Sequence, residues 1–235
     1  MPDLRYATPS GELGGYLATP IGSGPHPGVI VIQDVLGLSD DIRGQADRLA
    51  AAGYLALAPD LYSGRGIRCV LATMQASRSG RGSAYEEIEA ARSMLLARED
   101  CTERVGIIGF CMGGGFALLC APRGGFAAAS VNYGEVPADA AQRLEGACPV
   151  IGSFGAKDFG LRGRAARLEQ ALQAVDVAHD VKEYTQAGHS FLNRLNAGPL
   201  LTPLLHVAGL GYEHVAAEDA WRRILEFFAE HLDAA

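Results

Sequence analysis

The sequence predicts an α/β fold in which helices cover both faces of a mostly parallel β-sheet. Short apolar or β-branched runs alternate with helix-like segments along most of the chain, a pattern typical of strand–helix–strand units. The apolar runs are nearly continuous, as in strands that are buried on both faces. No internal repeat or linker separates independent cores, and 235 residues fit one domain better than two. We therefore expect residues 1–235 to form a single domain.

Six runs are interpreted as buried strands. The clearest are GVIVIQ, YLALAPD and RVGIIGF, which are short and rich in apolar or β-branched residues. In chain order, the expected strands are Gly28–Gln33, Tyr54–Asp60, Arg104–Phe110, Ala127–Asn132, Pro149–Phe154 and Asp180–Tyr184. Ligands of such folds bind beyond the carboxyl ends of the strands. The loops that follow these strands should therefore carry the chemistry.

Helix-like segments lie between and after these strands. They are Asp41–Ala52, Tyr85–Ala97, Gly114–Ala121, Arg164–Ala174 and Ala217–Leu232. The last segment places Trp221, Leu225 and Phe228 at helical spacing, which predicts core packing. The stretch Ser63–Ser83 is rich in Gly, Arg and Ser. It is interpreted as a solvated loop or a mobile flap over the site, and we favour the flap.

Composition and charge exclude several classes of function. No apolar run approaches the roughly 20 residues of a membrane-spanning helix. The net charge of -7 comes without a Lys/Arg tract, so nucleic acid is not an expected partner. Five cysteines without a CxxC pair or zinc spacing favour neither a disulfide framework nor a metal site. The N-terminal sequence lacks the pattern of a secretory signal, and we expect a cytoplasmic protein.

The strongest chemical motif is GFCMGG at residues 109–114. It follows a predicted strand and precedes a predicted helix, as does the nucleophile elbow GxSxG, with cysteine here in the serine position. The turn is so sharp that side chains at Gly109 and Gly113 would collide. It also places the sulfur of Cys111 at a helix N-terminus, where the dipole favours a thiolate. Cys111 is therefore the candidate nucleophile.

A base and an acid follow in the order that such hydrolases use. Asp158 in GAKDFG and His189 in AGHSF each follow a predicted strand, which places both at carboxyl ends of the sheet. The order nucleophile, acid, histidine predicts a Cys111, Asp158 and His189 triad. The other five histidines lack such a loop: His26, His179, His206, His214 and His231. Of these, His206 and His214 remain reserve candidates.

GFCMGG, FGAKD and GHSF, with VIQDVLG at 31–37 and GYLALAPDLY at 53–62, resemble the dienelactone hydrolase family. The resemblance covers nearly the whole chain. It implies an eight-stranded α/β-hydrolase domain that hydrolyses a lactone or ester through this triad, without metal or organic cofactor. It also implies that Asp34 contacts the resting thiol and releases it when substrate binds. The enzyme that defines the family has glutamate at this position, so the side chain here is one methylene shorter.

The resemblance further implies an oxyanion hole formed by the backbone N–H groups of Met112 and Val35. Family enzymes bind a substrate carboxylate with arginines, for which Arg81 and Arg194 are the candidates here. Arg194 lies one residue later than the family arrangement requires, and surface arginines are commoner than ligand-binding ones. Recognition of a carboxylate therefore remains open.

Four further questions also remain open. The substrate could be a lactone or small ester of the dienelactone type, or an unrelated ester cleaved by a general carboxylesterase. In a different class of function, a low-pKa Cys111 could serve a non-catalytic redox-sensing protein. The protein could be a monomer or a small homo-oligomer, and the segment Asn196–His214 could close the pocket, fill the core or contact another subunit.

Overall fold

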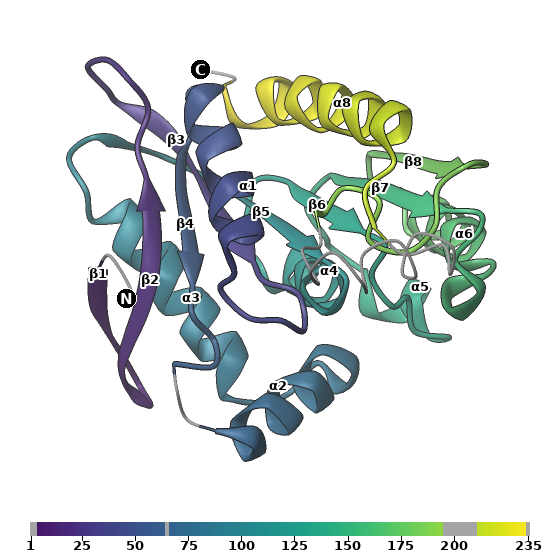
Figure 1. The fold of residues 1–235 in the computed structure, drawn as a ribbon, viewed down its shortest axis with the longest axis horizontal. Helices are drawn as coiled ribbons and strands as arrows, with labels where there is room; N and C mark the ends of the chain where they lie inside the picture. Colours follow the sequence, from purple (N-terminus) through teal and green to yellow (C-terminus); the bar gives the residue numbers. More distant parts are fainter. Residues whose placement is uncertain (1–3, 64–65, 195–210, 234–235) are drawn as a thin grey trace, which may run out of the picture.

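A single eight-stranded sheet organises the chain, in the strand order β1-β2-β4-β3-β5-β6-β7-β8 (Figure 1). The structure is a computed structural model that describes residues 4–63, 66–194 and 211–233. Strands β1 and β2 pair antiparallel with each other, and β2 pairs antiparallel with β4, whereas the remaining strands are parallel. The strands are β1 Leu4–Thr8, β2 Gly11–Ala18, β3 His26–Ile32, β4 Leu55–Pro59, β5 Cys101–Phe110, β6 Ala129–Asn132, β7 Val150–Gly155 and β8 His179–Tyr184. This confirms the predicted fold class.

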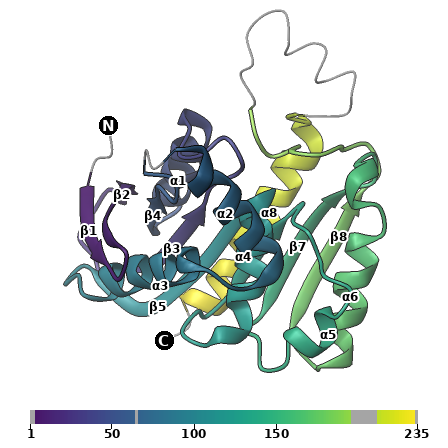
Figure 2. The same cartoon turned by 90° about the horizontal axis from the view of Figure 1, so that it is seen from below.

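Helices cover both faces of the sheet (Figures 1 and 2). One face packs against α1 and α8, and the other packs against α2 to α6. The helices are α1 Asp40–Ala51, α2 Ile67–Ser79, α3 Ser83–Leu96, α4 Met112–Cys120, α5 Ala140–Arg143, α6 Arg164–Ala174 and α8 His214–Leu232. Trp221 and Phe228 on α8 are fully buried, as their spacing predicts.

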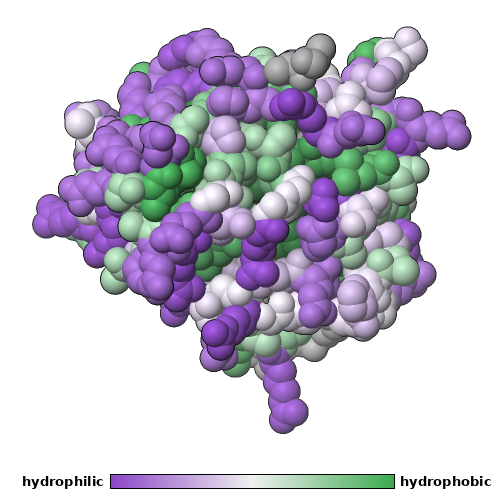
Figure 3. Space-filling view, turned by 180° about the vertical axis from the view of Figure 1, so that it is seen from behind, coloured by the Kyte–Doolittle hydropathy of each residue, from purple (hydrophilic) through white to green (hydrophobic). Residues whose placement is uncertain are grey.

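Alternate residues of the central strands pack into opposite cores. In β3, Val29 and Val31 face the helices α1 and α8, whereas Ile30 and Ile32 face the other layer. All four are completely buried, which explains why the strand is a continuous apolar run rather than an alternating one. On the face turned away in Figure 1, hydrophilic side chains surround a band of hydrophobic residues (Figure 3).

The prediction for the stretch Ser63–Ser83 was wrong in its secondary structure, because residues 67–79 form the helix α2. The glycines that suggested a loop lie at its ends. Gly66 precedes the helix with φ 77°, and Gly80 ends it in the left-handed conformation with φ 74°. Such a C-terminal glycine is a common helix stop signal. Glycine here marks where the helix begins and ends.

Two strands had no counterpart in the sequence prediction. Strands β1 and β2 form an antiparallel hairpin at the edge of the sheet. The segment GELGGYLA of β2 contains three glycines, which are depleted in strands. Gly15 lies against β4 so closely that a Cβ atom there would be 3.0 Å from the carbonyl oxygen of Ala58. The close approach of the two backbones therefore explains why this strand contains glycine, the residue type that hid it from the sequence prediction.

Candidate active site

The elbow places Cys111 between β5 and α4, at the carboxyl end of the sheet. Its backbone has φ 55° and ψ -114°, a conformation that side chains rarely adopt and that often occurs at functional sites. The Cys111 N–H donates to the carbonyl oxygen of Asn132 at 3.0 Å, which fixes the turn to the end of β6. Cys111 is the N-cap residue of α4, so the helix begins directly after the candidate nucleophile.

The two flanking glycines are required by the backbone of the turn. A Cβ atom at Gly109 would lie 1.9 Å from the carbonyl oxygen of Gly113. A Cβ atom at Gly113 would lie 2.3 Å from the carbonyl oxygen of Ile32 on β3. Real Cβ contacts are never this short, and both obstacles are backbone atoms. The collision expected from the sequence is therefore present at both positions.

The three residues predicted as a triad lie in one chain of contacts. His189 Nε2 is 3.1 Å from Cys111 Sγ, and His189 Nδ1 is 2.5 Å from Asp158 Oδ2. The other carboxylate oxygen of Asp158 accepts from the N–H groups of Gly160 and Leu161 at 3.1 and 3.2 Å. Asp158 follows β7 and His189 follows β8, so the ends of three parallel strands bring the side chains together.

The environment of His189 favours its protonated form. Burial disfavours the charged imidazole, but the hydrogen bonds to Asp158 and Cys111 outweigh it and raise the pKa of His189 to about 10. Because the folded-state pKa lies above the ordinary 6.5, the hydrogen bonds of His189 to Asp158 and Cys111 stabilise the folded protein fully below about pH 6.5. The contribution is lost as the pH rises through the pKa of about 10.

We expect the His189 imidazole to remain protonated at about pH 8 and to lose its proton near pH 10, as followed by NMR of the ring nitrogens. Cys111→Ala removes one of the two hydrogen-bond partners and should lower this pKa. Cys120→Ala removes a buried thiol elsewhere on α4 and should leave it unchanged. A wild-type imidazole that titrates near its ordinary 6.5 would contradict the expectation.

The proposed oxyanion donors line one small cavity with the triad. Val35 and Met112 border a cavity of about 160 Å³ together with Cys111 and His189. The peptide after Val35 is held at both ends: Tyr62 Oη donates to the Val35 carbonyl oxygen at 3.2 Å, and Leu36 N–H donates to Asp34 Oδ1 at 2.7 Å. The loop is thus fixed in place before any substrate binds.

Asp34 lies beneath this loop and is 3% exposed. Burial raises the pKa of its carboxyl group above the ordinary value, although the hydrogen bond from Leu36 opposes the change. In this structure Cys111 Sγ contacts His189, and Asp34 contacts the loop. The predicted contact of Asp34 with the resting thiol is therefore not the arrangement seen here.

The two candidate substrate arginines lie outside this cavity. The N–H of Arg194 donates to Asp41 at 2.7 Å, and its guanidinium lies 4.6 Å from the ring centre of Tyr212. Arg81 is exposed and borders a separate hollow with Arg123 and Arg143. Neither side chain borders the cavity at Cys111.

The structure instead places Arg78 and Glu135 at the cavity. Arg78 is exposed on the last turn of α2, and Glu135 is paired with Arg164 at 2.7 Å. No local sequence pattern points to Glu135, and none distinguishes Arg78 from the other arginines in a stretch interpreted as a loop. Helical spacing would have placed it on one face with Met74, which also borders the cavity.

The remaining histidines described by the structure lie away from the cavity. His26 and His179 begin strands β3 and β8, and His231 packs on Phe227 near the end of α8. Of the two reserve candidates, His214 begins α8 beside Tyr212, whereas His206 lies outside the described residues. Within residues 4–63, 66–194 and 211–233, no cluster of three or more His, Cys, Asp or Glu is arranged for a metal ion. No helix in these ranges is long and apolar enough to span a membrane.

The sheet order, the strand-to-helix turn at Cys111 and the position of His189 after the last strand define an α/β-hydrolase fold. The sequence profile of the dienelactone hydrolase family matches residues 13–232. The chain therefore belongs to the dienelactone hydrolase family.

Individual relatives agree with this assignment. The chain is 31% identical to a "putative carboxymethylenebutenolidase" of Escherichia coli over 88% of this chain and 78% of the relative. It is 28% identical to a protein of the same name from Methylorubrum extorquens, over 97% and 80%. Among solved structures, a dienelactone hydrolase-like promiscuous phosphotriesterase from metagenomic libraries is 26% identical with a TM-score of 0.77, covering 97% of this chain and 96% of that one.

Proposed function

We propose that this member of the family hydrolyses a lactone or small carboxylic ester, with Cys111 as nucleophile, His189 as base and Asp158 as the residue that orients the base. The observation that carries the proposal is the continuous chain of contacts from Cys111 Sγ through His189 to Asp158. A redox sensor needs a reactive thiol but has no use for an imidazole held between the thiol and a buried carboxylate. The geometry therefore favours a hydrolase over the redox alternative.

The proposed reaction begins with the thiolate of Cys111 and the imidazolium of His189. The thiolate attacks the ester carbonyl carbon, and the carbonyl oxygen becomes an oxyanion. In this proposal the backbone N–H groups of Val35 and Met112, two residues that border the cavity, donate to it, each stabilising the transition state by about 3 kcal/mol. His189 then gives its proton to the leaving alkoxide, which leaves a thioester on Cys111.

Hydrolysis of the thioester regenerates the enzyme. The neutral His189 takes a proton from a water molecule, and the resulting hydroxide attacks the thioester carbonyl carbon. Collapse of the second oxyanion releases the carboxylic acid and restores the Cys111 thiolate beside the protonated imidazole. Asp158 holds Nδ1 of His189 throughout, so that Nε2 faces the sulfur.

Asp34 remains a proposed regulator of the thiol. Burial raises the pKa of its carboxyl group, so the neutral form is more accessible here than in an exposed aspartate. In this structure it holds the loop of the proposed oxyanion donor Val35 through Leu36. A rotation that released Leu36 would free the carboxyl group and loosen that loop at the same time.

For the substrate, we propose a carboxylate group recognised by Arg78 at the rim of the cavity. Arg78→Ala should raise KM for dienelactone by about tenfold or more, since a charged hydrogen bond of this kind contributes roughly 1.5–3 kcal/mol. The same substitution should leave KM for an uncharged aryl acetate within about twofold. Steady-state kinetics on both esters measures the difference.

Arg81→Ala is the matched control, because Arg81 lies three positions along the chain and borders a different hollow. It should leave both KM values unchanged. Equal losses on the two esters in Arg78→Ala, or a loss specific to dienelactone in Arg81→Ala, would contradict carboxylate recognition by Arg78.

The test of the proposed function compares dienelactone with a simple aryl acetate, using the wild type and Cys111→Ala. Rapid turnover of dienelactone that disappears in the variant supports both the nucleophile and the substrate class. Turnover of the aryl acetate alone supports the mechanism in a general carboxylesterase. No hydrolysis of either ester by the wild type would overturn the proposal.

A further inference from the structure

Tyr133 packs directly against the histidine of the site. It follows β6 and borders the cavity with Cys111. Its ring lies 5.3 Å from the imidazole of His189, with the two planes at 64°. The side chain is 1% exposed, and its backbone has φ 39°, a left-handed conformation that is a genuine outlier for a bulky residue. The fold thus holds this ring beside His189 at a conformational cost.

The hydroxyl of Tyr133 begins a buried chain of hydrogen bonds that leads away from the site. It donates to Asn193 Oδ1, and Asn193 Nδ2 donates to Asp41 Oδ2. Asn193 is completely buried, and Asp41 lies in the first turn of α1. Burial raises the pKa of Tyr133 well above its ordinary value, so the phenol stays a donor. The amide of Asn193 must therefore turn its oxygen to Tyr133 and its NH₂ to Asp41.

The backbone that follows His189 is fixed to the same helix. Arg194 N–H donates to Asp41 Oδ1 at 2.7 Å, and Gln45 Nε2 donates to the Leu192 carbonyl oxygen at 2.9 Å. Asp41 therefore holds both the side chain of Asn193 and the backbone of its neighbour. Because these contacts begin three residues after His189, they restrict where the imidazole can lie.

We propose that Asp41, Asn193 and Tyr133 form a positioning network that holds the imidazole of His189 against the sulfur of Cys111. The inference rests on the proposed triad function and adds three positioning residues to the triad. Their hydrogen-bonding groups bond to one another rather than to the reacting atoms. Asparagine is the side chain that suits the middle position, since it accepts from a phenol at one end and donates to a carboxylate at the other. Leucine has a similar volume and can do neither.

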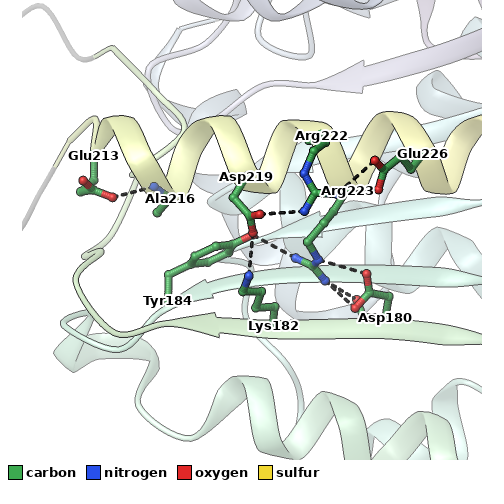
Figure 4. A network of polar contacts seen from close by, with 9 residues as sticks. All are labelled: Asp180, Lys182, Tyr184, Glu213, Ala216, Asp219, Arg222, Arg223 and Glu226. Carbon is green, nitrogen blue, oxygen red and sulfur yellow. Dashed lines mark hydrogen bonds and ion pairs between the residues drawn. The ribbon is translucent and has the colours of Figure 1, made fainter.

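A second buried tyrosine hydroxyl offers a matched control. Tyr184 Oη donates to Asp219 at 2.9 Å and accepts from Arg223 at 3.1 Å. These residues belong to the ion-pair network that fastens α8 to strand β8 (Figure 4). Tyr184→Phe therefore removes a buried, hydrogen-bonded tyrosine hydroxyl, as Tyr133→Phe does. Among the described residues, its partners Asp219 and Arg223 make no contact with His189 or Cys111.

The experiment measures the pKa of the His189 imidazole in Tyr133→Phe, Asn193→Leu, the double variant and Tyr184→Phe. The imidazole is followed by NMR of its ring nitrogens, and kcat and KM are measured on an aryl acetate. Tyr133→Phe should lower kcat about tenfold, equivalent to about 1.4 kcal/mol of barrier, with KM within about twofold. The pKa of His189 should fall below its wild-type value of about 10, because a displaced imidazole loses the hydrogen bond to Cys111 that helps to raise it.

If the three residues act as one network, Asn193→Leu and the double variant should show the same change in the His189 pKa as Tyr133→Phe, without an added effect. Tyr184→Phe should lower the unfolding temperature without changing the His189 pKa. A His189 pKa in Tyr133→Phe that matches the wild type would overturn the network, as would an equal change in Tyr184→Phe. Hydrolysis that survives in Cys111→Ala would instead overturn the proposed function, so the two failures are distinguishable.

Discussion

Cys111→Ala is expected to lower ester hydrolysis by roughly 10⁴-fold or more, because the proposed mechanism has no other group that can form the acyl-enzyme intermediate. The sulfur lies 3.1 Å from His189 Nε2, and the proposed oxyanion donors border the same cavity. Removal of the sulfur leaves only the oxyanion hole and substrate binding, which alone give a small residual rate. The measurement is kcat/KM on an aryl acetate and on dienelactone.

Cys120→Ala is the control for this experiment. Cys120 lies on the helix that begins after Cys111, and burial raises the pKa of its thiol to about 12. It should not react, and its removal should leave hydrolysis unchanged. Equal activity in Cys111→Ala and wild type would remove Cys111 from the mechanism. A large loss in Cys120→Ala with the fold intact would show that the chemistry does not depend on Cys111 alone.

Gly109→Ala is expected to destabilise the folded protein by about 3 kcal/mol or more, the upper range for overpacking a rigid site. The new methyl group would lie 1.9 Å from the Gly113 carbonyl oxygen and 2.2 Å from the Gly113 carbonyl carbon. Both atoms are backbone, so the strand and the helix must separate before the methyl group fits. The midpoint of denaturant unfolding measures the loss.

Gly44→Ala is expected to have the opposite effect on the free energy of unfolding. Gly44 lies within α1, and a Cβ atom there would meet nothing within 4 Å. Alanine should stabilise the protein by about 0.5–1 kcal/mol, since glycine inside a helix loses more conformational entropy on folding. An unfolding midpoint for Gly109→Ala similar to that of the wild type would show that the elbow can relax, contrary to the expectation.

The local part of the site could be predicted from the sequence. The elbow is a local requirement, because Gly109 and Gly113 must lack side chains whatever surrounds them. Asp158 and His189 could be selected because each follows a buried strand, and parallel strands bring their carboxyl ends to one edge of the sheet. The structure brings both residues into contact with Cys111 as a chain.

The groups around the triad depend on contacts between distant segments. Arg78 borders the cavity because α2 is a helix rather than a loop. Asp41 and Asn193 meet across 152 positions of the chain, and no spacing rule connects them. The strand order, in which β4 lies between β2 and β3, likewise depends on which strand edges pair.

By itself the sequence determined the fold class, most of the strands and helices, the family and the candidate triad. These follow from patterns within a few residues: apolar runs, helix ends and a turn that tolerates only glycine. The tertiary structure decided that Arg78 rather than Arg81 or Arg194 borders the cavity, that Asp34 holds a loop, and that Tyr133 is tied to α1. The surroundings of these residues are formed by segments far apart in the chain, so no local sequence pattern predicts them.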